Sequence, residues 1–252
     1  MMRWLGLFLL IMAAPVSAAK AANVLVTDIS KDHISIRSNF TGESLLLFGA
    51  IDTSIYGPVD GIVVTLRGPN ENVMLRKKQK QFGIWVNDAA YKLGPLPGFY
   101  AVVSSQPLGA LMPFDEQRAR GIGTESLQAN LLNGTAGEEE KDEALAAFIR
   151  LKEKDALFDT RSDRVEIISG KLFRAEINLP AGMPVGRSVS EFFAFKNGRL
   201  VGYQTGELPV DIVGAGHILH QAAYDMSLIY GIAGVVMALI MGWGVAVLFR
   251  RQ

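Results

Sequence analysis

Hydrophobic residues form one long run at each end of the chain and shorter runs between them. The first long run extends from Trp4 to Ala14, directly after Arg3, and is followed by Pro15 and small residues up to Ala18. This order is typical of a secretory signal peptide, and it predicts a signal over residues 1–18. An uncleaved anchor is the alternative, although the run is shorter than the roughly 20 residues of a membrane span.

The second long run, Met226–Phe249, contains 24 residues and no charge. As a helix it would be about 36 Å long, which exceeds the roughly 30 Å hydrocarbon core of a bilayer. Arg250 and Arg251 follow at once, and arginines beside a span mark its cytoplasmic side. The pattern predicts a transmembrane helix over 226–249, a cytoplasmic tail over 250–252, and a body on the opposite side. A buried core helix is the alternative.

Between these ends, short runs of β-branched and aromatic residues recur about every 8–12 residues, with turn residues between them. Arg67–Glu71 is expected to be a turn between paired strands, and Asn197-Gly198 a two-residue hairpin turn. The pattern predicts a mainly β fold, an immunoglobulin-like β-sandwich. The expected strands are Val24–Ile29, His33–Arg37, Ser44–Ile51, Gly61–Arg67, Asn72–Arg76, Phe82–Val86, Phe99–Ser104, Val165–Ile168, Leu172–Leu179, Val189–Phe195 and Leu200–Thr205.

Helix-forming residues interrupt the strands, which predicts a helical insertion over 112–160. Thr124–Leu132 is a short candidate helix and Glu138–Leu157 a longer one, with Leu145, Phe148, Ile149 and Ala156 on one face. Its three opening glutamates favour a helix N-terminus. The expected organisation is a β segment over 19–111, the insertion, a second β segment over 161–213 and a linker over 214–225. The two β segments could form one sandwich or two.

Composition narrows the function. The chain has 25 basic and 25 acidic residues, so it shows no overall charge that favours nucleic acid. It has no cysteine, which excludes disulfides, thiolate nucleophiles and zinc or iron–sulfur sites built on cysteine. No motif of a zinc protease, phosphate-binding loop, dinucleotide site or nucleophile elbow occurs. We therefore expect a protein that is not an enzyme and that carries no cofactor.

His217, His220 and Asp225 are the candidate metal ligands. The histidines stand three positions apart, so they would share one face of a helix, with Asp225 further along. Two imidazoles and a carboxylate could bind copper or zinc. The alternative is a pair of histidines at the membrane interface.

The densest basic patch consists of Arg76, Lys77, Lys78 and Lys80. It could contact anionic lipid headgroups or an anionic solute. The alternative is a solvated turn between strands, where lysine also discourages edge pairing.

Small residues recur every fourth position in the expected span, at Gly234, Ala238, Gly242 and Ala246. Lipid provides no hydrophobic drive for helix association, so close backbone approach at small residues is what pairs such helices. The stripe predicts a helix partner in the membrane, either another protein or a second copy. The alternative is that glycine and alanine are simply common in such helices.

Several short motifs resemble a family of alphaproteobacterial transmembrane proteins of unknown function. They are Leu47–Ile51, Pro97–Tyr100, Leu172–Ala175, Leu179–Gly182, Pro184–Gly186, Tyr230-Gly231 and Gly242-Trp243. The resemblance covers nearly all of the mature chain. It implies a bacterial inner-membrane protein with a periplasmic N-terminal domain, no assigned activity, and a partner of the taurine/sulfite-exporter permease type.

Together these features predict a single-span, membrane-anchored periplasmic protein that acts as an accessory or interaction subunit of a membrane partner such as a permease. The alternative is a periplasmic module that binds a metal or an anion.

Overall fold

The computed structural model describes residues 24–127, 130–131, 138–213 and 227–249. Thirteen strands and several helices lie in these ranges, and strands predominate. The strands form three sheets of four, six and three members. The expectation of a mainly β fold is therefore confirmed.

The four-stranded sheet has the order β1-β3-β11-β10, and all its pairs are antiparallel. Burial alternates along β11, where Phe173, Ala175 and Ile177 are buried and the residues between them are exposed. This alternation is what a strand with one solvated face requires. The members are β1 Leu25–Ile29, β3 Gly42–Ile51, β10 Val165–Ile168 and β11 Leu172–Pro180.

The six-stranded sheet has the order β2-β13-β12-β4-β7-β9, in which only the outermost pairs, β13 with β2 and β7 with β9, are parallel. Its central strand β4 is buried on both faces, since Ile62 to Leu66 are all buried. The members are β2 Ile34–Ile36, β4 Gly61–Arg67, β7 Tyr100–Ser104, β9 Phe158–Ser162, β12 Gly186–Lys196 and β13 Arg199–Ile212.

The two large sheets pack face to face through one hydrophobic core. Leu45 and Phe173 of the smaller sheet belong to the same buried cluster as Val64 and Phe192 of the larger one. Strands from 25–104 and from 158–212 share both sheets, so the two β segments form one body. The turn at Asn197-Gly198 joins β12 to β13 as expected, with φ of 50° and 72° at its two residues.

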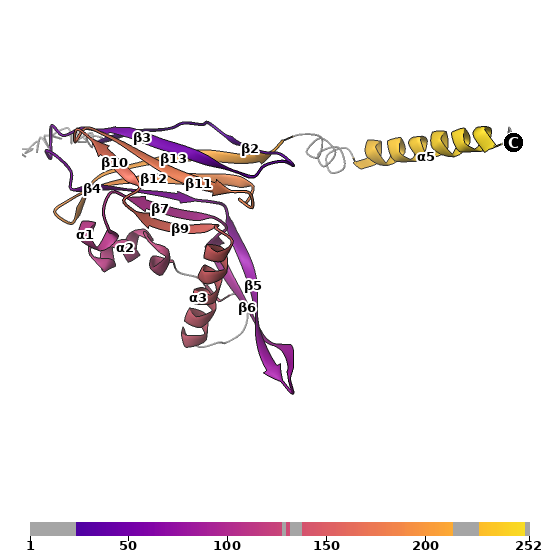
Figure 1. Cartoon of the computed structure of the whole chain (residues 1–252), viewed down its shortest axis with the longest axis horizontal. Helices are drawn as coiled ribbons and strands as arrows, with labels where there is room; N and C mark the ends of the chain where they lie inside the picture. Colours follow the sequence, from indigo (N-terminus) through magenta and orange to yellow (C-terminus); the bar gives the residue numbers. More distant parts are fainter. Residues whose placement is uncertain (1–23, 128–129, 132–137, 214–226, 250–252) are drawn as a thin grey trace, which may run out of the picture.

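A second core lies on the outer face of the larger sheet, where Figure 1 shows α1, α2 and α3 together. Phe148 of α3 packs edge-on against Phe158, with 5.5 Å between ring centroids. Tyr100 and Phe193 complete the same cluster from the sheet. The helices are α1 Leu108–Leu111, α2 Phe114–Arg120, the 3₁₀ turn Thr124–Ser126 and α3 Glu138–Lys154.

The insertion is only partly as expected. The helix from Glu138 is confirmed, but it ends at Lys154, and Ala156 adopts a positive φ of 55° outside it. The helix expected over Thr124–Leu132 is wrong, because the described residues of this range form a 3₁₀ turn at Thr124–Ser126 and the short strand β8 (Asn130–Leu131). Strand β9 also begins before residue 160, because its pairing with β7 draws Phe158 into the second core.

The third sheet is a long hairpin, β5 (Asn70–Gln81) and β6 (Ile84–Pro97), with β8 paired to the base of β6. Two expectations fail here. The segment Arg67–Glu71 does not join paired strands, because β4 and β5 belong to different sheets. The basic patch is not a turn either, since Arg76 to Lys80 lie within β5.

The C-terminal helix, α5, spans Ser227–Phe249. Among the residues whose placement the structure describes, no helix is long and apolar enough to qualify as a membrane span. The span expected over 226–249 therefore stays a prediction.

Candidate functional site

The expected metal ligands, His217, His220 and Asp225, lie outside the described residues. Within the ranges that the structure describes, no group of three or more His, Cys, Asp or Glu side chains could hold a metal ion. The metal site therefore stays a prediction.

The stripe of small residues lies along α5, and its four members Gly234, Ala238, Gly242 and Ala246 are exposed. No described atom outside the helix comes within 4 Å of a Cβ built at Gly234 or Gly242. The stripe thus has open space in front of it, which is compatible with the close approach of a second backbone.

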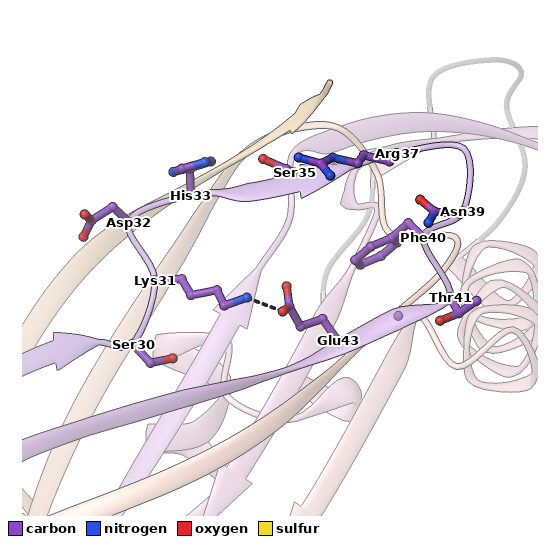
Figure 2. Close-up of a pocket in the computed structure, with 11 residues that line it drawn as sticks. Ser30, Lys31, Asp32, His33, Ser35, Arg37, Asn39, Phe40, Thr41 and Glu43 are labelled. Carbon is purple, nitrogen blue, oxygen red and sulfur yellow. Dashed lines mark hydrogen bonds and ion pairs between the residues drawn. The ribbon is translucent and has the colours of Figure 1, made fainter. Parts of the chain in front are cut away.

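A concavity of about 720 Å³ lies between β2 and β3 and is lined by residues from Ser30 to Glu43. Figure 2 shows Lys31 reaching across it to form an ion pair with Glu43 on β3, while Phe40 points into the same space. His33 is exposed just before β2 and points away from that ion pair.

This concavity contains polar side chains, but they do not converge on one point. Lys31 is paired with Glu43, and His33 is turned outward. A ligand pocket needs several polar groups aimed at the same place, together with apolar walls. The concavity fits a wet surface between strands better than a ligand pocket.

The concavity reaches one end of the body, which we call the exit end. Here β13 finishes at Ile212 and the chain continues toward α5. The parallel register pairs Ile36 of β2 with Ile212, and the amide of Val213 donates to the carbonyl oxygen of Ile36 at 2.9 Å. The end of β2 therefore lies beside the end of β13 and Val213.

Proline and glycine residues from distant segments meet at the exit end. The amide of Gly98 donates to the carbonyl oxygen of Pro69 at 2.9 Å. A Cβ at Gly98 would lie 3.0 Å from Pro184, and one at Gly186, whose φ is 135°, would lie 3.2 Å from Pro69. Two of the motifs behind the family resemblance, Pro97–Tyr100 and Pro184–Gly186, are thus packed together as turns, and their role is structural.

Arg67 and Glu191 form a polar cluster on the outer face of the larger sheet. The Arg67 Nε donates to Glu191 Oε2 at 3.0 Å, and the Tyr203 hydroxyl donates to Glu191 Oε1, also at 3.0 Å. Arg67 Nη2 donates to the carbonyl oxygen of Gly121 at 2.6 Å. The cluster ties the end of α2 to the sheet.

Tyr100 belongs to the same cluster. Its hydroxyl donates to the carbonyl oxygen of Gly121 at 2.7 Å and accepts from the amide of Gly123 at 2.9 Å. Burial raises the pKa of Tyr100 to about 12, although the nearby Arg67 opposes this shift. Burial and the hydrogen bond to Glu191 also raise the pKa of Tyr203. Tyr100, which is buried and bonded on both sides, thus holds the turn after α2 in place.

The fold is a mainly β body, followed by a C-terminal helix with no charged residue. The family whose model matches residues 24–251 is described as "Putative transmembrane protein (Alph_Pro_TM)". The match covers nearly all of the chain, and the chain belongs to this family. No curated protein matches the chain, and neither does any solved structure.

Proposed function

We propose that the chain is a single-span protein of the bacterial inner membrane, with its β body in the periplasm and its C-terminus in the cytoplasm. Membership of a family described as transmembrane supports this topology. The signal-like N-terminus supports export, and Arg250 and Arg251 after the apolar helix support the cytoplasmic position of the C-terminus.

What supports a span over residues 226–249 is their sequence, in which no residue is charged. Helix α5 covers nearly all of this run. Its 23 residues contain no charged side chain. At 1.5 Å per residue the helix is about 35 Å long, slightly more than the roughly 30 Å hydrocarbon core. Among its described residues, nearly all side chains are exposed, as a helix surrounded by lipid requires.

We further propose that the protein is an accessory or interaction subunit of a membrane partner such as a permease. The observation that carries this proposal is the open stripe on α5. An anchor alone needs only apolar residues, whereas Gly234 and Gly242 leave room for another helix backbone to approach.

The first prediction concerns this stripe. Replacing both Gly234 and Gly242 by leucine should abolish association with the partner, or with a second copy, because the two side chains would separate the backbones. Crosslinking in native membranes, followed by co-purification and identification of the bound protein, measures the loss.

A matched control changes the same helix on its other side. Gly244 lies away from the stripe at about 100° per residue, so Gly244→Leu with Val236→Leu should leave association intact. Equal association of both double variants with the partner would contradict the role of the stripe.

For the body, we propose an immunoglobulin-like sandwich. The order β1-β3-β11-β10 corresponds to strands A-B-E-D of that fold, and β13-β12-β4-β7 corresponds to G-F-C-C′. In this correspondence the β5–β6 hairpin is an insertion between C and C′. An experimentally determined structure with a different strand order would contradict it.

The alternative function is a module that binds a metal through His217, His220 and Asp225, or an anion through the basic patch of Arg76, Lys77, Lys78 and Lys80. Calorimetry of the full chain with copper, zinc and small oxyanions tests it, and an absence of heat would end it.

A further inference from the structure

The β5–β6 hairpin has a supported base and an unsupported tip. At the base, Leu93 and Leu96 are buried in the second core beside α3. Lys152 of α3 pairs with Glu71 at 2.5 Å, and Lys77 pairs with Glu143 at 2.8 Å. Beyond these contacts, residues 78–87 form the tip, which Figure 1 shows projecting away from the sheets.

The tip presents large apolar side chains to solvent. Phe82 is 105% exposed, Ile84 71% and Trp85 66%. An apolar patch of this kind on a projecting element marks an interaction site, because nothing in the fold of the body requires it.

The turn at the tip shows that Phe82 is not there for local folding. Phe82 and Gly83 have φ of 51° and 86°, and they form the two-residue turn of the hairpin. Asparagine, aspartate or glycine normally occupies the first position of such a turn, since a bulky side chain is strained at positive φ. The hairpin therefore holds a phenyl ring at its apex despite the backbone strain at Phe82.

Basic residues flank the apolar apex. In the register of the hairpin Lys80 lies opposite Trp85, so their side chains share one face, and Lys78 follows two positions further from the apex on the same strand. Neither lysine forms an ion pair with an acidic residue in the part of the chain that the structure describes. Aromatic rings with free lysines just behind them match the interface of an anionic bilayer, where rings sit at headgroup level.

The hairpin also starts at the exit end of the body. Arg67, the last residue of β4, pairs with Val189 of β12, and Val189 pairs with Glu207 of β13. From Glu207, strand β13 continues to Ile212 at the exit end. The chain thus leaves the sheet for the hairpin at the same end from which it leaves for α5. In Figure 1 the hairpin points down and toward the end of the body at which β2 lies.

We propose that residues 78–87 insert the Phe82, Ile84 and Trp85 side chains into the outer leaflet of the membrane that α5 crosses, with Lys78 and Lys80 on anionic phospholipid headgroups. This inference rests on the proposed topology. A protein groove would bind one face of the hairpin, but apolar side chains lie on both, Trp85 on one and Ile84 on the other. Lysine is also depleted in protein interfaces. Both features favour lipid.

The three tryptophans of the chain provide a direct test. The full-length chain is made in two forms, Trp4→Phe with Trp243→Phe, which leaves Trp85, and Trp4→Phe with Trp85→Phe, which leaves Trp243 in α5. Each form is reconstituted into vesicles of phosphatidylcholine and phosphatidylglycerol that carry bromine at shallow or deep acyl positions. Bromine quenches a tryptophan only at close range, so the loss of fluorescence reports the depth of each ring.

We expect Trp85 to be quenched most by shallow bromines and to lose this quenching in vesicles of phosphatidylcholine alone. Trp243 should be quenched in both vesicle types. In the Trp85 form, Phe82→Asn should reduce the quenching while the hairpin still folds, because asparagine suits the positive φ of the turn. Lys78→Glu with Lys80→Glu should also reduce it. The control Lys171→Glu with Arg199→Glu, the same charge change on exposed residues at the other end of the body, should not.

The quenching measurement separates a failure of the hairpin proposal from a failure of the proposed membrane anchor. If Trp243 is quenched and Trp85 is not, the hairpin proposal is overturned and the anchor stands. If neither is quenched, the anchor itself is wrong. If Trp85 emission shifts to the blue without quenching, and more so at higher protein-to-lipid ratio, the tip binds a second copy of the chain and the lipid proposal is overturned.

Discussion

At the scale of single residues, Tyr100 occupies the most restrictive surroundings. It is fully buried, its ring lies 5.0 Å from the Arg67 guanidinium carbon, and its hydroxyl is bonded on both sides by the segment after α2. An ionised hydroxyl could no longer donate to Gly121, so the folded body favours the neutral tyrosine.

This preference predicts a decline in stability at high pH. The pKa of Tyr100 is about 12 in the folded state, against an ordinary value of 10.0. Between pH 10 and pH 12 the folded chain therefore keeps the hydroxyl proton that the unfolded chain has lost. The stabilisation is complete below pH 10 and falls away between pH 10 and 12, by up to about 3 kcal/mol. Urea denaturation of the full chain in detergent, followed by circular dichroism across this pH range, measures it.

Tyr100→Phe is the control for the pH effect, since it keeps the ring and removes the titrating group. The variant should be less stable at neutral pH but should lose most of the decline above pH 10. The remainder comes from other groups whose pKa is raised in the fold, Tyr203 and Lys77. An unchanged decline in the variant would show that another group is responsible.

Sequence patterns identified some residues well and missed others. Asn197-Gly198 was predictable because the turn depends only on local φ values. The Arg67–Glu191 pair was not, since its partners stand 124 positions apart and meet only through the pairing of β4 with β12. The sequence predicts a strand that begins at Phe82, whereas Phe82 forms the hairpin turn together with Gly83. The turn was missed because the residue before a turn glycine is normally small and polar, and here it is a phenylalanine.

At the scale of elements, α3 is the part of the insertion that organises the outer face of the larger sheet. One face of it packs on Phe158, and its two lysine–glutamate contacts support the base of the hairpin. The periodicity of α3 was visible in the sequence. The residues that α3 packs against were not, because they come from distant parts of the chain.

A pair of substitutions in α3 tests its packing. Phe148→Ala should destabilise the body by about 3–5 kcal/mol, because Phe148 is buried and its loss leaves a cavity. Leu151→Ala in the same helix should change stability by no more than about 0.5 kcal/mol, because Leu151 is exposed. Thermal unfolding of both variants measures the difference, and similar losses would mean that α3 does not pack as described.

Strand lengths were the weakest expectation at this scale. Arg76–Lys80 and residues 87–92 are too polar to indicate strands, yet they extend β5 and β6 into one long hairpin. Backbone pairing between the two strands needs no buried side chain, so a solvated hairpin leaves little trace in the hydrophobic pattern.

At the scale of the whole molecule, the proposed topology predicts that α5 anchors the body to the membrane. A form of the chain that ends at Asp225 should be recovered in the periplasmic fraction after a high-salt wash, which removes attraction between the hairpin lysines and lipid. The full chain should remain in the membrane. Fractionation of intact cells and spheroplasts, with the body probed by external protease, measures both results.

The outcome that would contradict this topology is specific. A truncated form that stays bound to the bilayer after the wash, or a body protected from protease in spheroplasts, would place the anchor or the body elsewhere.

The sequence by itself determined the mainly β class, the two apolar ends, the position of α3 and the absence of cysteine chemistry, because each depends on local composition or periodicity. Only the tertiary structure decided that strands from both halves share one body, that the proline and glycine motifs meet at the exit end, and that a basic, aromatic hairpin leaves the body there. These features depend on pairings between residues far apart in the chain, and such pairings leave no periodic signal along it.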